Sequence, residues 1–180
     1  NDGPPLYWKT AAERIYGKEN VVHLIPDGNW DESIYGKFDY HFWVDWGEDA
    51  LMPMLPYSPL TPPKPNIYVT SDTHLGYDYR LTRAREFDLV FCNQLAAQEQ
   101  FIKDGIHRER CFWLPHAAEP LAYPKKDIIN KYDVCFIGNI GAYNRVDFLD
   151  RMFKEFPNFF YGKRLFESAA EIYSSSKIVL

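Results

Sequence analysis

Short apolar runs alternate with amphipathic segments along most of this 180-residue chain. The spacing of Trp8, Ala11, Ala12 and Ile15 predicts a first helix over residues 6–16, which Gly17 ends. Runs rich in aromatic and β-branched residues predict strands over residues 21–25, 40–44, 67–69, 89–92, 111–114, 134–137, 159–161 and 178–180. Helical patterns separate the later strands, over residues 79–86 and 94–104, from Asn144 to Phe156 with Val146, Leu149, Phe153 and Phe156 on the inner face, and from Gly162 through Tyr173. This alternation predicts an α/β protein with parallel, doubly wound sheets that carry helices on both faces.

Two proline-bearing segments interrupt the pattern. Residues 52–65 are too rich in proline to hold a helix or a central strand. Residues 118–131 combine two prolines with mixed charge, so we expect an interdomain linker there, between a first domain over residues 1–117 and a second over residues 132–180. The chain opens on loop-forming residues and stops within a strand pattern at Leu180. We therefore expect a fragment, truncated at both ends and lacking the first strand of its first domain.

Charge and cysteine content narrow the classes of protein. The formal net charge is -5 and the chain has no basic run. Both features argue against a protein that binds nucleic acid by neutralising its phosphates. No apolar run approaches the roughly 18 residues that span a bilayer, and the first residues do not resemble a signal peptide. We therefore expect no transmembrane segment and a cytoplasmic protein. Cys92, Cys111 and Cys135 each lie in a strand-like run without a Cys-x-x-Cys spacing, which predicts core thiols.

The stretch from Ile67 to Gly76 carries the strongest candidate chemistry. An apolar strand there ends in Thr70, Ser71, Asp72, Thr73 and His74, and side chains just past the carboxyl end of a parallel strand reach the edge where ligands bind. On extended chain Asp72 and His74 share a face, as a proton-transfer pair or a metal-ligand pair would. The alternative is that Asp72 caps the following turn and His74 bonds locally. His116 follows another strand in the same way.

A second candidate is the glycine turn Gly138-Asn139-Ile140-Gly141 between a predicted strand and a predicted helix. Glycine lets the backbone approach a phosphate, helix N-terminal amides face the anion, and Arg145 could fork onto a diphosphate. The pattern is neither Gly-x-Gly-x-x-Gly nor a P-loop, and its alternative is a tight turn with Arg145 paired to a surface acid. An acidic segment with Asp45, Glu48 and Asp49 is a candidate rim of a site, or a solvated turn.

Two families share motifs with the chain. Asp72-Thr73-His74 is similar to the opening metal motif of calcineurin-like metallophosphoesterases, but the chain has no Gly-Asp dipeptide, and Ile140 stands where that family has the histidine of Gly-Asn-His. The motifs Asp72-Thr73-His74-Leu75-Gly76-Tyr77-Asp78-Tyr79-Arg80-Leu81, Ala84-Arg85-Glu86-Phe87-Asp88-Leu89-Val90-Phe91, Trp113-Leu114-Pro115-His116-Ala117 and Phe136-Ile137-Gly138-Asn139 strongly resemble the CgeB-like (spore maturation protein) glycosyltransferases, in order and spacing, from about Phe38 to Leu180.

This resemblance implies a GT-B glycosyltransferase with two Rossmann-like domains. The first would lie on the acceptor side, and the second would bind a nucleoside-diphosphate sugar, with a UDP-sugar as the first expectation. It implies no metal or other cofactor, and it favours retention of stereochemistry. Asp72 and His74 would then act on an unknown acceptor across an interdomain cleft, and Gly138, Asn139, Gly141, Arg145 and His116 would hold the donor phosphates or sugar. Tyr161, Gly162 and Lys163 would contact the nucleoside. The family's acidic ribose ligand is expected beyond Leu180, so the fragment could lack activity. A metallophosphoesterase and a non-catalytic nucleotide-binding or scaffold module stay open as alternatives.

Overall fold

The structure, a computed structural model, describes residues 4–23, 37–45, 64–117, 120–121, 123–141, 145–163 and 166–180. These residues form a mixed α/β protein with five α-helices and seven strands, and every strand pairing is parallel. Six sequence predictions fall wholly or partly outside the described residues: the end of the strand over 21–25, the acidic residues Glu48 and Asp49, the proline-rich residues 52–63, the Asn144 cap, and parts of the linker over 118–131 and of the helix from Gly162 through Tyr173.

The chain divides into two compact units. The four-stranded unit spans Tyr16–Ala117, and the three-stranded unit combines Asn1–Ile15 with Ala118–Leu180. The division after Ala117 coincides with the predicted end of the first domain, but the segment that the sequence assigns to a linker and the first 15 residues both group with the three-stranded unit. Whether the two units are the acceptor and donor domains of a glycosyltransferase stays a prediction.

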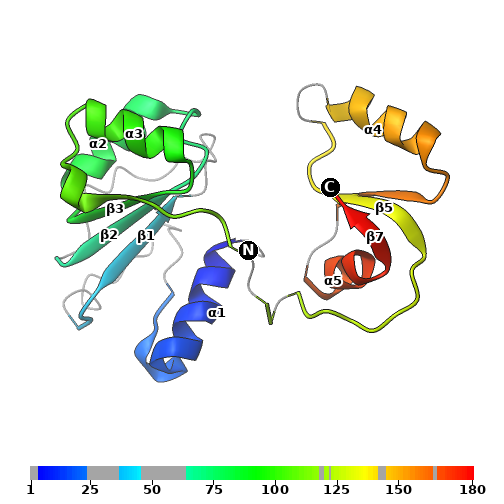
Figure 1. Cartoon of the computed structure of the whole chain (residues 1–180). Coiled ribbons are helices and arrows are strands. Elements are labelled where there is room, and N and C mark those ends of the chain that lie inside the picture. Colours follow the sequence, from blue (N-terminus) through cyan, green and yellow to red (C-terminus); the bar gives the residue numbers. More distant parts are fainter. Residues whose placement is uncertain are drawn as a thin grey trace. The chain divides into compact units, whose positions relative to one another are not determined.

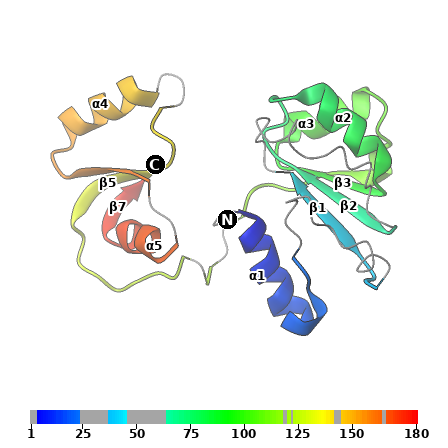
Figure 2. The same ribbon diagram turned by 180° about the vertical axis from the view of Figure 1, so that it is seen from behind.

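In the four-stranded unit, the strands lie in the order in which they occur along the chain (Figure 1). They are β1 (His41–Asp45), β2 (Asn66–Thr70), β3 (Leu89–Cys92) and β4 (Cys111–Trp113). Helices α2 (Tyr77–Glu86) and α3 (Leu95–Lys103) cover the same face of this sheet, as Figures 1 and 2 show. Among the described residues, the unit also contains two short 3-10 helices, η1 (Lys18–Asn20) and η4 (Arg108–Arg110). Helices on both faces are therefore not found among the described residues of this unit.

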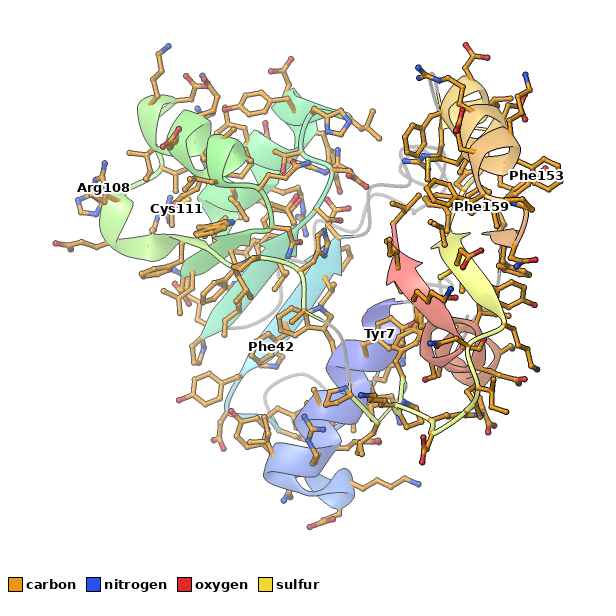
Figure 3. The ribbon with its side chains drawn as sticks, turned by 45° about the vertical axis from the view of Figure 1, so that its right-hand side comes forward. Tyr7, Phe42, Arg108, Cys111, Phe153 and Phe159 are labelled. Atoms are coloured by element: carbon orange, nitrogen blue, oxygen red, sulfur yellow. The ribbon has the colours of Figure 1, made fainter. Side chains whose placement is uncertain are left out.

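The core of this unit lies between the sheet and its two helices. It consists of buried side chains from the strands, from α2 and α3 and from the turns after them: Tyr68, Ala84, Phe87, Val90, Cys92, Ala97, Phe101, Ile106 and Cys111. Figure 3 shows Cys111 on this inner side of the sheet. Gly105 ends α3 with a φ of +100°, and the amides of Gly105 and Ile106 bond the carbonyls of Ile102 and Phe101, at 3.2 and 2.9 Å. This is a Schellman motif, which a left-handed glycine makes possible.

In the three-stranded unit, β5 (Tyr132–Ile137) lies between β6 (Phe159–Gly162) and β7 (Ser176–Val179). Helix α4 (Arg145–Glu155) covers one face of the sheet and α5 (Phe166–Ser174) the other, as Figures 1 and 2 show. Helices on both faces are thus confirmed for this unit. Helix α1 (Pro4–Tyr16) contributes Tyr7, whose ring packs edge-on against Tyr123 at a centroid distance of 5.8 Å.

Two predicted details are wrong. Residues 21–23 form no strand, because Val22 is about half exposed and lacks the burial that holds β-branched residues in a sheet. In α4, Val146 and Phe153 are about half exposed rather than buried, and Phe153 lies at the border of the sheet, where its ring meets that of Tyr161 edge-on at a centroid distance of 6.5 Å (Figure 3). The inner residues are Leu149, Met152 and Phe156, which pack against Val134 and Phe159. The prediction that the cysteines are core thiols is confirmed, since all three are buried and free.

Candidate functional site

The stretch from Ile67 to Gly76 forms a fully buried strand followed by a tight turn. All five residues of β2 are buried, because neighbouring strands flank it on both sides and α2 and α3 cover one face. After it Ser71 and Thr73 stay buried, whereas Asp72 and His74 are exposed. Asp72 has a φ of +46°, and its carbonyl accepts the amide of Leu75 at 2.8 Å. The extended conformation that would put Asp72 and His74 on one face is therefore wrong, and the turn of the alternative interpretation is present.

Backbone and side-chain hydrogen bonds hold this turn against the ends of the neighbouring strands. The carbonyl of Asp45, the last residue of β1, accepts the amide of Ser71 at 3.3 Å and its hydroxyl at 3.1 Å. On the other side, Oε1 of Gln94 accepts the amide of Thr73 at 3.2 Å. The amide of Asn93 donates to the carbonyl of Thr70 at 3.1 Å. The exposed side chains of the turn thus stand on a backbone that is fixed from both sides.

A buried ion pair lies at the base of the turn. Nε of Arg80, in α2, is 3.2 Å from Oδ2 of Asp45, and the side chains of the two residues are 0% and 2% exposed. The hydroxyl of Tyr68 donates to the same carboxylate oxygen at 2.6 Å. Burial, followed by the neighbouring Asp45 charge, raises the pKa of Tyr68 well above its usual range, so this phenol stays a donor. Asp45 is therefore not part of a solvated turn, which corrects one of the two interpretations of the acidic segment.

One feature of the sequence indicates the buried cluster of Asp45, Tyr68 and Arg80. Arg80 lies one helical turn before Ala84, which is fully buried on the inner face of α2, so the two residues share that face. A charged residue on an inner face needs a partner, because a buried charge without one is costly. The identity of that partner could not be read from the sequence, because 35 positions of chain separate Asp45 from Arg80.

The ends of β3 and β4 continue the same edge of the sheet. The side-chain amide of Asn93 donates from Nδ2 to the backbone carbonyl of Leu114 at 2.9 Å. The indole nitrogen of Trp113 donates to the backbone carbonyl of Asn93 at 3.3 Å. His116 follows three residues after the end of β4 and is exposed. Asp72, His74 and His116 therefore belong to loops at one edge of one sheet. Their roles in an acceptor or phosphate site stay predictions.

The glycine turn after β5 is tied to the end of β6. The amide of Gly138 donates to the carbonyl of Gly162 at 3.0 Å. Within the turn, Oδ1 of Asn139 accepts the amide of Gly141 at 3.2 Å, and Nη1 of Arg145 donates to the Asn139 carbonyl. The structure thus brings together the predicted phosphate-binding residues, and it puts Gly162 beside them. His116 belongs to the other unit.

Aromatic packing accounts for two of these residues. A Cβ at Gly138 would lie 2.8 Å from Cζ of Phe136, so the glycine leaves room for that ring. The guanidinium of Arg145 lies 5.3 Å from the centroid of the same ring, a cation–π arrangement that holds it beside the turn. The Tyr161 ring packs on Phe159 and is about two-fifths exposed. Gly138 and Arg145 therefore have a structural role besides any ligand contact.

The strand order gives the turn a distinctive position. β5 comes first along the chain and lies in the centre, β6 adds on one side of it, and β7 adds on the other. The connections leave the carboxyl ends of β5 and β6 for opposite faces of the sheet, through α4 and α5. In open parallel sheets a crevice forms at such a topological switch point, just outside the carboxyl ends of the strands, and ligands bind there. The residues from Gly138 to Gly141 occupy this position.

A pocket of about 570 Å³ lies at the opposite end of the same sheet. Its lining includes Ser176, which begins β7, and Asn130, which precedes β5, so it borders the amino ends of these strands. Its other lining residues are Tyr123, Pro124, Lys125, Ala170, Tyr173, Ser174 and Lys177. None of the predicted site residues lines it. Lys177 is also engaged with Asp133 at 2.6 Å, and this ion pair lowers the pKa of Asp133.

Metal ligands do not gather in the part of the chain that the structure describes: no group of three or more His, Cys, Asp or Glu residues there could hold a metal ion. Within the same residues, no helix has both the length and the apolar character needed to cross a membrane. Comparison of the chain with protein-family models, with curated proteins and with solved structures finds no match. The assignment of function therefore rests on the geometry and chemistry of the two strand-end sites.

Proposed function

We propose that the protein is a metal-independent GT-B glycosyltransferase that moves a sugar from a nucleoside diphosphate to an acceptor. The observation that carries this proposal is the glycine turn Gly138–Gly141 at the switch point of the three-stranded sheet. That position, an adjoining helix start and an arginine beside the turn together make a favourable environment for a diphosphate. The two parallel α/β units of the chain are compatible with the pair of Rossmann-like domains that the proposal requires.

In this proposal the leaving diphosphate is stabilised by fixed dipoles and by one cation. The amides of the turn and of the first residues of α4 would donate to phosphate oxygens, and their orientation is set before the ligand binds. Arg145 would supply the positive charge. Its guanidinium carries five N–H donors, and the bond to the Asn139 carbonyl uses Nη1 only, so the remaining edge can fork onto a phosphate. Lys163, just after β6, is exposed and would contact the nucleoside from the neighbouring strand end.

Asp72 and His74 would work on the acceptor side. Both are exposed on a turn whose backbone is fixed by Asp45 and Gln94, which suits groups that orient or deprotonate an acceptor hydroxyl. A retaining transfer, as the family resemblance implies, needs little more from the protein than donor and acceptor orientation and charge stabilisation at the diphosphate. The proposal therefore assigns charge stabilisation to the three-stranded unit and acceptor binding to the four-stranded unit.

Binding of UDP tests the donor half of the proposal. We expect UDP to raise the melting temperature of the protein without added metal, with a stabilisation of about 2.7 kcal/mol at a UDP concentration 100-fold above Kd. Arg145→Met should weaken UDP binding by tenfold or more, since a hydrogen bond to a charged group contributes about 1.5–3 kcal/mol. Arg151→Met is the matched control, because Arg151 is an exposed arginine of the same helix and bonds within that helix to the Asp147 carbonyl.

Turnover separates an enzyme from a binding module. UDP release measured over a panel of UDP-sugars should exceed the background hydrolysis for at least one donor. UDP binding that depends on Arg145, with no release from any donor, would instead support a non-catalytic nucleotide-binding module. If neither UDP nor another nucleoside diphosphate changes the melting temperature, the proposed donor site is wrong.

A further inference from the structure

The four strands of the first sheet end in register. The last residues of β1, β2, β3 and β4 are Asp45, Thr70, Cys92 and Trp113, and each is paired with the next across the sheet. Residues paired in this way point to the same face. Three of these four side chains are buried, whereas Trp113 is 50% exposed. The carboxyl edge of the sheet therefore presents a large apolar ring to solvent at its β4 end.

The Trp113 ring is held in place. Its indole nitrogen donates to the carbonyl of Asn93, the side chain of Asn93 donates to the carbonyl of Leu114, and the amide of Leu114 donates to the carbonyl of Cys92 at 2.9 Å. These bonds fix both the ring and the backbone on either side of it. An exposed tryptophan that is fixed in this way loses little side-chain freedom when a ligand stacks on it.

Polar groups able to bind hydroxyls stand on the same edge. Asp72 and His74 follow β2, and His116 follows β4. Neighbouring strands are about 4.8 Å apart, so the ends of β2 and β4 are separated by roughly 10 Å. Two linked sugar rings can cover that distance. The loops are also joined to one another, since Gln94, which follows β3, bonds the amide of Thr73 in the β2 loop.

We propose that this edge binds the acceptor as a carbohydrate, with one sugar ring stacked on Trp113 and hydroxyls of a second ring hydrogen-bonded to Asp72 and His74. A sugar presents an apolar C–H face and a rim of hydroxyls, and a site for it combines an aromatic platform with a few fixed polar groups. The proposal rests on the proposed function, of which it specifies the acceptor class.

The surroundings favour a sugar over a nucleic acid strand. Bases also stack on exposed aromatic rings, but sites for single strands add a positively charged groove along the phosphates. Here the groups nearest the edge include the carboxyl of Asp72, and the chain as a whole carries a net charge of -5. A neutral polyhydroxyl ligand pays no electrostatic penalty in such a setting.

The probes are four disaccharides, cellobiose, maltose, lactose and chitobiose, added singly without nucleotide. We expect at least one to shift the indole N–H resonance of Trp113 in a ¹H–¹⁵N spectrum and to receive saturation from aromatic protons of the protein. Trp113→Ala should weaken its binding about tenfold, the loss of one stacking platform, and Trp113→Phe should weaken it less. Asp72→Asn and His74→Ala should each weaken it as well.

Phe153→Ala is the matched control, because Phe153 is an exposed aromatic residue, 55% exposed, on α4 of the other unit. It should leave disaccharide binding unchanged. The inference is overturned if none of the four sugars shifts the Trp113 resonance, or if Trp113→Phe and Trp113→Ala bind as tightly as the parent chain. UDP binding through Arg145 is measured separately. Loss of sugar binding with UDP binding intact refutes only the acceptor inference, whereas sugar binding without any nucleotide binding refutes the donor site.

Discussion

The buried Asp45–Arg80 pair gives a sharp prediction about stability. Arg80→Met keeps most of the side-chain volume and removes the guanidinium, which leaves the Asp45 carboxylate, 2% exposed, without this cation. Removing one partner of a fully buried ion pair costs about 3–5 kcal/mol, because the remaining charge stays out of water. Exposed pairs contribute a median of only about 0–1 kcal/mol, so the burial decides the size of the effect.

Urea unfolding followed by far-UV circular dichroism measures this loss. With a slope of about 2 kcal/mol per molar urea, the midpoint of the four-stranded unit should fall by about 2 M. Arg85→Met is the matched control on the same helix. Arg85 is exposed and donates to the Asp104 carbonyl at 3.2 Å, and its loss should change stability by under about 0.5 kcal/mol.

Two further variants test whether Asp45 and Arg80 act as a buried charge pair. Tyr68→Phe removes one hydrogen bond to a charged carboxylate and should cost about 1.5–3 kcal/mol, less than Arg80→Met. The double variant Asp45→Asn with Arg80→Met removes both charges, so it should be more stable than the sum of its single changes predicts. An Arg80→Met variant within 1 kcal/mol of the parent chain, or strict additivity in the double variant, would refute the account of a buried charge pair.

Three other changes probe the strand ends. Lys64 lies 2.8 Å from Asp88 and lowers the pKa of that carboxyl. The ion pair therefore stabilises the fold at neutral pH, by at most about 1 kcal/mol. This contribution is lost as the pH falls through the lowered pKa of Asp88. Asp88→Asn should therefore be less stable than the parent chain at pH 7 and equal to it in acid, by urea unfolding. Gly138→Ala should displace the Phe136 ring, cost about 1–3 kcal/mol and weaken UDP binding in a thermal-shift titration. His74→Ala should change stability by under about 0.5 kcal/mol, because His74 is exposed, yet lower sugar transfer, and unchanged transfer would remove His74 from the site.

The apolar pattern predicts the central parallel strands well because their side chains are buried or partly buried. The runs around Ile67, Leu89 and Val134 all became central strands, and burial leaves little choice of conformation there. Val22 has the same β-branched character, but it is about half exposed, and residues 21–23 form no strand. Composition identifies residues that suit a strand, but such residues form a strand only where they pair with a neighbouring strand and are buried.

The inner face of α4 shows a related limit. Successive residues of a helix turn by about 100°, so Leu149, Met152 and Phe156 fall within a narrow stripe, whereas Val146 and Phe153 lie to one side of it. The sequence contains apolar residues in both stripes, and the choice between them depends on where the sheet lies. Phe159 and Val134 of the sheet contact the first stripe, which settles the orientation of the helix.

The position of the catalytic candidates was predictable, but their conformation was not. A polar run directly after a buried strand places Asp72 and His74 at the carboxyl edge of the sheet, as the sequence indicates. The positive φ of Asp72 depends on the bonds that hold the turn, from Asp45 on one side and Gln94 on the other. Short polar residues tolerate this backbone region best, so an aspartate serves the turn whether or not it also serves a reaction.

The role of Asp72 in the turn decides how substitutions there should be interpreted. A change to asparagine keeps the tolerance for positive φ and removes only the charge, whereas a change to alanine removes both. If Asp72 acts on an acceptor, Asp72→Asn should lower activity while the melting temperature stays near that of the parent chain. If Asp72 serves only the turn, Asp72→Asn should be neutral in both measurements and Asp72→Ala should lower the melting temperature. The two variants therefore separate a catalytic role of Asp72 from its role in the turn, which the sequence alone does not distinguish.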